Sequence, residues 1–182
     1  MFQYKVAPVI ETPRLIIRIV SLDDATDFFE FCSDPNVTKY LTFSPYNSLS
    51  HTKRIINNMI NAYIHGSDVN FSVILKENYK VIGSISLSFK EFDNIAEIGY
   101  LFNSLYWNKG YGDEALKKVI DIAFNYYNLD MLIASYISLN KSSEKLLLRN
   151  NFIIDNVLKK SLNKNNQFYD IVNCYLVKQN ID

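Results

Sequence analysis

Residues that commonly build metal sites and disulfides are scarce in this sequence. Its 182 residues include two cysteines and two histidines. Cys32 and Cys174 lie far apart in the chain without partners at metal-ligand spacing, and His51 and His65 are equally isolated. Because metal sites and disulfide frameworks need such residues in clusters, we expect two buried thiols and no metal site.

Glycine and proline are also scarce, at five and four residues. No internal repeat, low-complexity tract or linker rich in proline, glycine and serine divides the chain. The sequence therefore predicts a single domain over residues 1–182, long enough to bury a core. With so few glycines, the placement of Gly110 and Gly112 one residue apart needs an explanation.

Net charge and long apolar runs are missing as well. The 19 basic and 19 acidic residues cancel, so the chain lacks the one-sided field of a protein that binds nucleic acid or an anionic membrane. The densest basic cluster, LKKSLNK at residues 158–164, is interpreted as a solvated loop. No apolar run approaches the roughly 20 residues that span a bilayer, and residues 1–14 lack a signal-peptide pattern. We expect a cytoplasmic protein with no nucleic acid and no membrane as partners.

The apolar residues that are present follow the periods of helices and strands. Hydrophobic residues make up 48% of the chain and aromatic residues 14%, which is typical of a folded protein. Their spacing predicts, in chain order, a strand at 14–20, helices at 21–32 and 50–65, strands at 70–76, 81–89 and 96–102, a long helix at 113–127, a strand at 131–137, a short helix at 142–150, and strands at 152–158 and 169–177. Turn residues at 78–80 and 93–94 favour an antiparallel meander of the three central strands. This order predicts a mixed α/β fold.

The sequence WNKGYG at residues 107–112 leads directly into the long helix. A helix N-terminus has backbone N–H groups without internal partners and a partial positive charge, so it attracts anions. Glycines in the preceding loop let a phosphate approach the backbone. Gly110 and Gly112 therefore form either a diphosphate site or a plain turn from strand to helix. The fingerprints of nucleoside triphosphate and dinucleotide loops are both incomplete, and Asp113 and Glu114 would repel a phosphate unless they point aside.

The surrounding sequence separates these alternatives. AEIGYLFNSLYWNKGYGDEALKKVIDIAF, at residues 96–124, resembles the core of the GNAT superfamily of acetyl-CoA-dependent acetyltransferases, in the branch of the ribosomal-protein N-terminal (Rim-type) acetyltransferases. The segments ETPRLIIR, VIGSISL, SLNKSSEKLLLRNNF and YDIVNCYLV extend the resemblance over almost the whole chain. It implies the GNAT fold, a roughly seven-stranded mixed sheet splayed in the middle and flanked by about four helices.

The resemblance implies acetyl-CoA as the acetyl donor, with its diphosphate held by the backbone N–H groups of residues 108–113. It also implies that the exposed edge of strand 97–102 pairs with the pantetheine arm where the sheet splays away from strand 131–137. The implied coenzyme-binding residues are Leu101, Phe102, Asn103, Trp107, Asn108, Lys109, Gly110, Tyr111, Gly112, Asp113 and Asn140.

Three features depart from the family pattern. Trp107 takes the first position of the Arg/Gln-x-x-Gly-x-Gly/Ala signature, so phosphate contacts would rest more on the backbone. Asn151 stands where a glycine usually precedes Phe152, and because asparagine tolerates the left-handed conformation of a helix end, we expect the fold to be retained. The loop at 161–170 lacks the acidic segment of some relatives, so no catalytic carboxylate is expected from it.

Glu97 is the candidate general base. It shares a strand face with Gly99 and Leu101, next to the expected thioester. A carboxylate in a central sheet is unfavourable unless it is paired or functional, and an amine attacks a thioester only as the free base. The alternative is a structural carboxylate paired with a neighbouring arginine or a backbone amide.

Ser143 is the candidate proton donor to the leaving thiolate. It belongs to the sequence Asn140-x-x-Ser143 at the start of the short helix, and the resemblance places such a serine beside the thiolate. Many superfamily members use a tyrosine one turn later, where this chain has Leu147. The alternatives are a purely structural polar residue in the first helical turn and the neighbouring Ser142 as donor.

These features together predict an N-acetyltransferase that moves acetyl from acetyl-CoA to a primary amine by direct attack in a ternary complex. The acceptor is either a protein N-terminus or a small molecule, and the protein is expected to be a monomer or homodimer. Residues 40–53 lack the acidic run that a polyamine would favour. The alternative functions are a non-catalytic acyl-CoA-binding sensor and a flavodoxin-like phosphate-binding domain; the antiparallel meander disfavours the latter.

Overall fold

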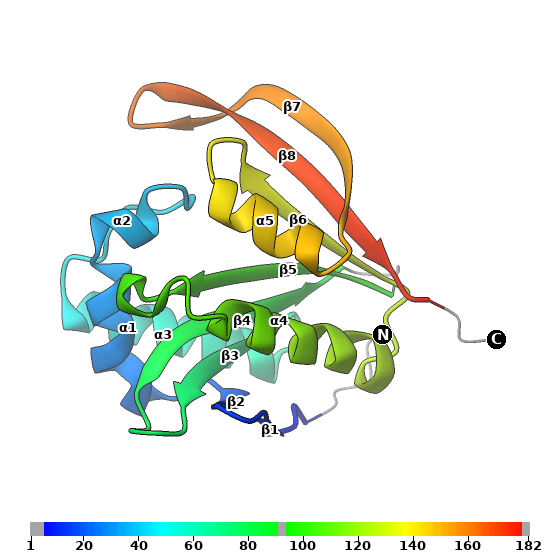
Figure 1. The fold of residues 1–182 in the computed structure, drawn as a ribbon. Coiled ribbons are helices and arrows are strands. Elements are labelled where there is room, and N and C mark those ends of the chain that lie inside the picture. The colour runs from blue at the N-terminus through cyan, green and yellow to red at the C-terminus, as the bar shows by residue number, and fades with distance from the viewer. Residues whose placement is uncertain (1–5, 91–93, 180–182) are drawn as a thin grey trace.

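The computed structural model describes residues 6–90 and 94–179 and contains one mixed sheet (Figure 1). The eight strands lie in the order β1-β2-β3-β4-β5-β6-β8-β7. The strands are β1 Ile10–Glu11, β2 Leu15–Ile19, β3 Asp68–Leu75, β4 Val81–Phe89, β5 Ile95–Phe102, β6 Met131–Ile137, β7 Ile153–Lys164 and β8 Gln167–Val177. The α-helices are α1 Ala25–Cys32, α2 Pro35–Thr38, α3 Leu49–Ile64, α4 Tyr111–Asp121 and α5 Lys141–Arg149.

Every predicted strand and helix is present, and the mixed α/β class is confirmed. The strand predicted at 152–158 continues to Lys164 as β7, so the interpretation of LKKSLNK at 158–164 as a loop was wrong; its residues pair with β8. The structure adds the two-residue strand β1 and the one-turn helix α2. Asp34-Pro35 therefore ends one helix and begins another: the Asp34 side chain accepts a hydrogen bond from Asn36 N at 2.8 Å, and proline suits the first helical position. The long helix after Gly110 ends in a π-helical turn, Ile122–Tyr126.

Several predicted turns and caps have the expected backbone. Tyr79, between β3 and β4, has a φ of 59°, and Asn94, before β5, has a φ of 43°; Asp93 of the predicted turn lies outside the described residues. Asn151 has a φ of 64°, and Phe152 N donates to Leu147 O at 3.1 Å, as in a helix end closed by a left-handed residue. The substitution of asparagine for glycine at 151 is thus accommodated.

The sheet splays between β5 and β6. β3, β4 and β5 form the predicted antiparallel meander, and β4 pairs with β5 as far as Phe102. β2 adds a fourth antiparallel strand beside β3. β5 and β6 are parallel and pair only from Ile95↔Met131 to Glu97↔Ile133. Among the described residues, Ile98–Phe102 therefore have no strand partner on the β6 side. This edge leaves backbone N–H and C=O groups available to a ligand.

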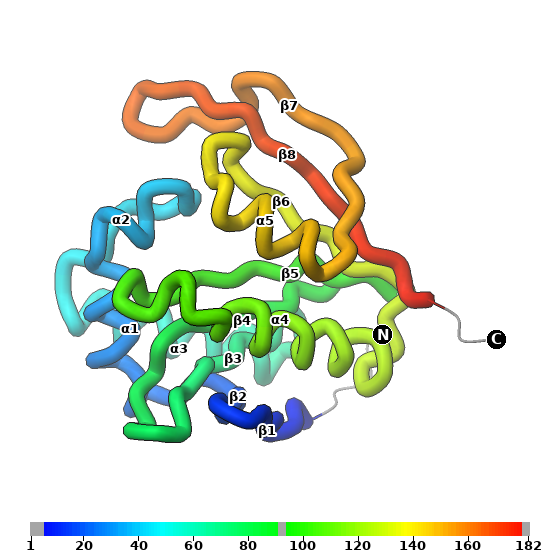
Figure 2. The backbone as a smooth tube through the Cα atoms, in the orientation of Figure 1, coloured from blue at the N-terminus to red at the C-terminus, as the bar shows by residue number. Residues whose placement is uncertain are grey.

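Helices cover both faces of the sheet (Figure 1). On one face, α4 buries Leu116 and Val119 against Ile85 and Ile98 of the central strands. On the other face, α1 and α3 bury an apolar cluster that includes Phe28, Phe31, Ile56, Ile74 and Val81. Full burial of one such side chain stabilises a fold by about 1.5–3 kcal/mol. The tube in Figure 2 shows the β7–β8 hairpin arching over α5 toward α2. No helix in the described part of the chain is long and apolar enough to cross a membrane.

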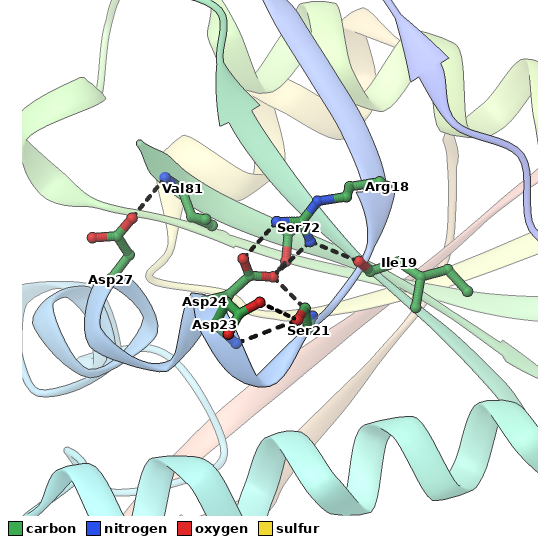
Figure 3. Close-up of polar contacts among 8 residues, drawn as sticks. All are labelled: Arg18, Ile19, Ser21, Asp23, Asp24, Asp27, Ser72 and Val81. Atoms are coloured by element: carbon green, nitrogen blue, oxygen red, sulfur yellow. Dashed lines mark hydrogen bonds and ion pairs between the residues drawn. The ribbon is translucent and has the colours of Figure 1, made fainter. Parts of the chain in front are cut away.

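A buried polar cluster attaches the start of α1 to the sheet (Figure 3). Asp24 is 3% exposed; its carboxylate accepts hydrogen bonds from Arg18 Nη2 at 2.7 Å, Ser72 Oγ at 2.6 Å and Ser21 N at 2.9 Å. Burial by itself would raise the pKa of Asp24, but these hydrogen bonds outweigh it and lower that pKa. Nearby, Asp27 accepts a hydrogen bond from Val81 N at 2.9 Å. Together these contacts hold the start of α1 against β2, β3 and β4.

Candidate active site

An open cleft of ≈ 620 Å³ lies where β5 and β6 diverge. The end of β5, the loop before α4, the start of α5 and the α2 segment form its walls. The lining residues are Asn36, Val37, Lys39, Tyr40, Leu41, Tyr100, Leu101, Phe102, Tyr106, Trp107, Asn108, Gly110, Tyr111, Gly112, Asp113, Asn140, Lys141, Ser142, Ser143, Lys145, Leu146 and Arg149. All predicted site residues except Glu97, Asn103 and Lys109 are among them, so the structure brings separate sequence segments to one place.

The loop between β5 and α4 is fastened to the end of the strand. Asn103 caps the 3-10 turn Ser104–Tyr106, and its side-chain oxygen accepts from Leu105 N at 3.0 Å. The Trp107 indole Nε1 donates to Phe102 O at 2.8 Å. Asn108 and Gly110 then adopt left-handed conformations, with φ of 60° and 79°. These turns direct the chain into α4, so its first turn, whose N–H groups lack intrahelical partners, lies at the cleft.

Gly110 and Gly112 have different structural roles. Gly110 is the residue before α4 and supplies a left-handed backbone, which only glycine adopts without strain. Gly112 has room for a methyl group but little more: a Cβ there would lie in van der Waals contact, 3.4 Å from Leu146 Cδ2 and 3.4 Å from Phe102 Cε2. A Cβ on Gly83, in β4, would collide with the Phe102 ring. Phe102 thus lies between two glycines, and α4 begins close to the end of β5.

The two acidic residues of the first turn of α4 are engaged by other side chains. Glu114 binds Arg14, whose Nε lies 2.6 Å from Glu114 Oε2. Burial alone would raise the pKa of Glu114, but hydrogen bonds from Thr12 and Arg14 lower it. Asp113 pairs with Lys117 at 2.8 Å and accepts from Asn150 Nδ2 at 2.9 Å, and the Lys117 bond is the main cause of its lowered pKa. The negative charges beside the glycine loop therefore have fixed partners.

Arg14 also braces the glycine loop from outside the cleft. Its Nη1 donates to Lys109 O at 2.9 Å, and its guanidinium lies 4.4 Å from the centre of the Tyr111 ring. The contact joins residues 95 positions apart, so the sequence alone gave no sign of it. A single side chain thereby links Glu114, the Lys109 carbonyl and the Tyr111 ring.

A row of cations on α5 was not predicted from the sequence. Lys141, Lys145 and Arg149 are spaced four residues apart and all line the cleft. Lys141 Nζ is ion-paired with Glu144 at 2.8 Å, and Lys39 lines the cleft from the α2 side. Since residues four apart share one helix face, the spacing itself was the available signal. The row adds positive potential beside the N-terminus of α4.

Ser143 faces a tyrosine that the sequence did not single out. The Asn140 side-chain oxygen accepts from Ser143 N at 3.1 Å, so Asn140 is the N-cap of α5 and Ser143 lies in its first turn. Ser143 Oγ lies 2.8 Å from Oη of Tyr100, which is in the middle of the unpaired part of β5. Burial raises the pKa of Tyr100 above its ordinary value. Tyr100, Ser142 and Ser143 all line the cleft.

Glu97 lies at the closed end of the splay, outside the cleft lining. Its carboxylate pairs with Lys90 Nζ at 2.8 Å, and both side chains are more than 40% exposed. The partner of Glu97 is thus a lysine. A structural carboxylate at this position was expected to pair with an arginine or a backbone amide. Ser86 and Ser88 of β4 lie opposite Gly99 and Glu97 and share the face of that carboxylate.

Asn103 and Lys109 also lie outside the cleft lining. The side chain of each contacts another part of the protein instead. Asn103 is 3% exposed, because its Nδ2 donates to Glu30 Oε1 at 2.8 Å on α1. The Lys109 ammonium lies 5.3 Å from the centre of the Tyr106 ring. Within residues 6–90 and 94–179, no three His, Cys, Asp or Glu side chains are grouped to hold a metal ion.

Known proteins are similar to this chain in sequence and in fold. The family model of the acetyltransferase (GNAT) domain matches residues 14–153. An uncharacterized N-acetyltransferase p20 from Bacillus licheniformis is 32% identical over 169 residues, covering 92% of this chain and 95% of the relative. The crystal structure of a GNAT-family acetyltransferase from Bacillus anthracis has a TM-score of 0.84 at 26% identity, covering 93% of this chain and 98% of that one.

A Rim-type enzyme has the same fold. The structure of RimL, a ribosomal L7/L12 alpha-N-protein acetyltransferase in complex with coenzyme A, has a TM-score of 0.85 at 15% identity, covering 95% of this chain and 98% of that one. The predicted mixed sheet, splayed in its middle, is the fold of these neighbours. The chain belongs to the GNAT acetyltransferase family, and the enzyme class predicted from the sequence, an acetyl-CoA-dependent N-acetyltransferase, is confirmed.

Proposed function

We propose that the protein transfers acetyl from acetyl-CoA to a primary amine, a protein N-terminus or a small-molecule amine, by direct attack within a ternary complex. The observation that carries this proposal is the convergence, on one cleft, of the open edge of β5, the glycine loop before α4 and the hydroxyl of Ser143. Each of these elements suits a different part of the acetyl donor.

The polyanionic end of coenzyme A fits the start of α4 and the cationic face of α5. Diphosphates bind well at a helix N-terminus, where free N–H groups and the helix dipole favour negative charge. Gly110 and Gly112 leave the backbone open there, and Asp113 and Glu114 are already paired with cations. Lys145 and Arg149 add positive side chains along the same cleft. The chemistry of the lining therefore supports a phosphate-rich ligand.

The pantetheine arm fits the unpaired edge of β5. Its amides have the same donor and acceptor groups as a peptide, so they can satisfy a free strand edge as an added strand does. Ile98–Phe102 offer such an edge within the described part of the sheet. An arm bound along it would bring its thioester end toward Tyr100 and Ser143, which line the same cleft.

The reaction requires a free amine and a route for two protons. At pH 7 a lysine side chain, with a pKa of about 10.4, is unprotonated about once in several thousand, and an α-amino group about once in ten. We propose Glu97 as the base that takes the amine proton, acting through water along Ser86 and Ser88. We propose Ser143 as the donor to the departing thiolate. Hydrogen bonds to charge that develops in the transition state give the largest share of such catalysis.

The acceptor end of the cleft carries no acidic residue from the α2 side. The lining there consists of Asn36, Val37, Lys39, Tyr40 and Leu41. A polycation would be repelled by Lys39 rather than attracted, which supports an acceptor with a single amine. The same lining suits a peptide N-terminus or a small amine.

Mass spectrometry of amine mixtures incubated with the protein and acetyl-CoA tests this function. The mixtures contain peptides with free N-termini, amino acids, polyamines and aminoglycosides, and a thiol reagent measures release of coenzyme A in parallel. We expect acetylated product and stoichiometric thiol with at least one class. Binding of acetyl-CoA without amine-dependent thiol release from any class would support the sensor alternative instead, which no observation favours.

A further inference from the structure

The hydroxyl groups of Tyr100 and Ser143 form a hydrogen bond across the cleft, and their acidities decide which of them donates. Tyr100 Oη lies 2.8 Å from Ser143 Oγ and 3.3 Å from Ser143 O, across 43 residues of sequence. We propose that Tyr100 is a positioning residue that aims the Ser143 hydroxyl into the cleft and passes a proton to it as that hydroxyl protonates the leaving thiolate. This inference rests on the proposed function of Ser143 and assigns a role to a residue on the opposite wall.

Both partners are held rigidly, which a directional hydrogen bond requires. Tyr100 is in β5, paired through its backbone with Ile85 of β4, and packs on the core next to α4. Ser143 is in the first turn of α5, where Asn140 caps the helix at Ser143 N. The bond therefore spans the cleft within the unpaired part of β5, beyond Glu97, the last residue that pairs with β6.

The acidities of the two groups set the direction of the bond. A phenol is a much stronger acid than an aliphatic alcohol, so Tyr100 is the better donor and Ser143 Oγ the better acceptor of the pair. With one lone pair of its oxygen occupied in this way, the Ser143 O–H is free to point into the cleft. Burial raises the pKa of Tyr100, which keeps the phenol protonated, and hence a donor, at neutral pH.

Without Tyr100, the Ser143 hydroxyl has a competing partner. A serine in a helix readily donates to the carbonyl three or four residues earlier. For Ser143 the helical carbonyl within reach is that of Asn140, the N-cap, which accepts from Glu144 N at 3.1 Å and so is directed along the helix. Tyr100 therefore selects the rotamer in which the hydroxyl proton remains available.

In the acetyl transfer, one C–N bond forms and one C–S bond breaks. The amine nitrogen forms a bond to the acetyl carbon and loses one proton to base or water, while the C–S bond breaks and sulfur keeps the electron pair. The sulfur takes the proton of Ser143 Oγ, and Ser143 Oγ takes the proton of Tyr100 Oη. The phenolate then recovers a proton from water. Because a thiol has a pKa of about 8.5, the help needed is moderate, and we expect effects of about one order of magnitude.

Tyr100→Phe tests the proposal, because it removes only the hydroxyl. We expect kcat to fall about 10-fold while KM for acetyl-CoA changes by less than about 2-fold, the pattern of an interaction made mainly in the transition state. Ser143→Ala should lower kcat by roughly 10- to 100-fold. The double variant should be no slower than Ser143→Ala, since Tyr100 acts only through that serine. Tyr63→Phe is the matched control: its hydroxyl accepts from Ala7 N at 3.0 Å, away from the cleft, and its kcat should equal that of the native protein.

Failure of the proposed acetyl transfer and failure of the Tyr100 role give different results. A native protein that releases no thiol with any amine overturns the proposed function. Native activity with an equally active Tyr100→Phe variant, or a double variant whose losses multiply, overturns the role of Tyr100 alone. If Tyr100→Phe does not fold, a single-turnover proton inventory on the native protein decides: a curved dependence on deuterium fraction supports two protons in flight, and a linear one contradicts the relay.

Discussion

Lys164 Nζ donates to the backbone carbonyl of Leu41 at 2.7 Å, joining the end of β7 to the loop that follows α2. It also donates to Thr38 O at 2.7 Å, and to Lys39 O and Phe43 O at longer distances. The turn after Lys164 is made by Asn165 and Asn166, both left-handed, as in a tight two-residue hairpin. Burial lowers the pKa of Lys164. The hairpin tip is thus pinned over the segment that lines the acceptor side of the cleft.

Replacing Lys164 with methionine should loosen this connection, because it removes the ammonium group while keeping an unbranched apolar side chain of similar length. Four carbonyls of the loop then lose their shared donor, so the loop should sample more conformations. We expect KM for the amine acceptor to rise about 3- to 10-fold with KM for acetyl-CoA nearly unchanged, and faster amide hydrogen exchange in residues 38–43. Lys159→Met is the control, since Lys159 lies on the same hairpin with a 77% exposed side chain paired only to Asp170. Unchanged exchange and acceptor KM would show that the connection has no role in the site.

Gly112 offers a graded test of the diphosphate site. A Cβ at this position meets its neighbours at 3.4 Å, so Gly112→Ala should fold and still be stabilised by acetyl-CoA. Gly112→Glu should fold but lose the rise in Tm on adding acetyl-CoA, because a ligand stabilises a protein only if the native state binds it. Gly112→Gln separates bulk from charge: an intermediate shift indicates that repulsion of phosphate contributes. A Gly112→Glu protein with normal coenzyme binding would move the diphosphate site elsewhere.

Glu97→Gln distinguishes a base from a structural carboxylate. It preserves shape and removes basicity, so turnover should fall about 10²-fold at neutral pH and recover as the pH approaches the amine pKa. Lys90→Met is the matched control, since it breaks the 2.8 Å ion pair and keeps the carboxylate. Because exposed pairs contribute only about 0–1 kcal/mol, neither change should lower Tm by more than a few degrees. A loss of activity that is equal at every pH, or shared by Lys90→Met, would assign Glu97 a structural role.

Asp24 should make stability depend on pH. Its pKa is lowered in the folded state, so its contribution is fully present above the unfolded pKa of about 3.9 and is lost as the pH falls through the folded pKa. Asp24→Asn leaves Arg18 without its carboxylate and should destabilise the protein by roughly 3 kcal/mol at neutral pH. Urea unfolding at pH 7, 5 and 3 measures both effects. Asp23→Asn, which changes a neighbouring exposed carboxylate, should retain the native pH dependence; an identical profile for Asp24→Asn would contradict the assignment.

The elements that positioned the site were visible in local patterns. The alternation in VIGSISLSF, the helical spacing that begins after Gly112 and the glycine pair itself all reflect backbone geometry over a few residues. These patterns, with the resemblance of residues 96–124, indicated the splayed sheet and most of the cleft lining. The cation row of Lys141, Lys145 and Arg149 was also available in the helical spacing, although no prediction used it.

Pairings between distant side chains were decided only by the tertiary structure. Tyr100 meets Ser143 across 43 residues, Arg14 meets Glu114 across 100, and Lys164 reaches Thr38 across 126. Whether Asp113 and Glu114 repel a phosphate, whether Glu97 has a partner and which hydroxyl faces Ser143 all depend on such contacts. The sequence by itself determined which segments become strands and helices and where the glycine turn before α4 lies, because those depend on local backbone and hydrophobic period. The partners of each charge and hydroxyl followed from how these elements pack, since a side chain binds whatever group the fold brings within about 3 Å of it.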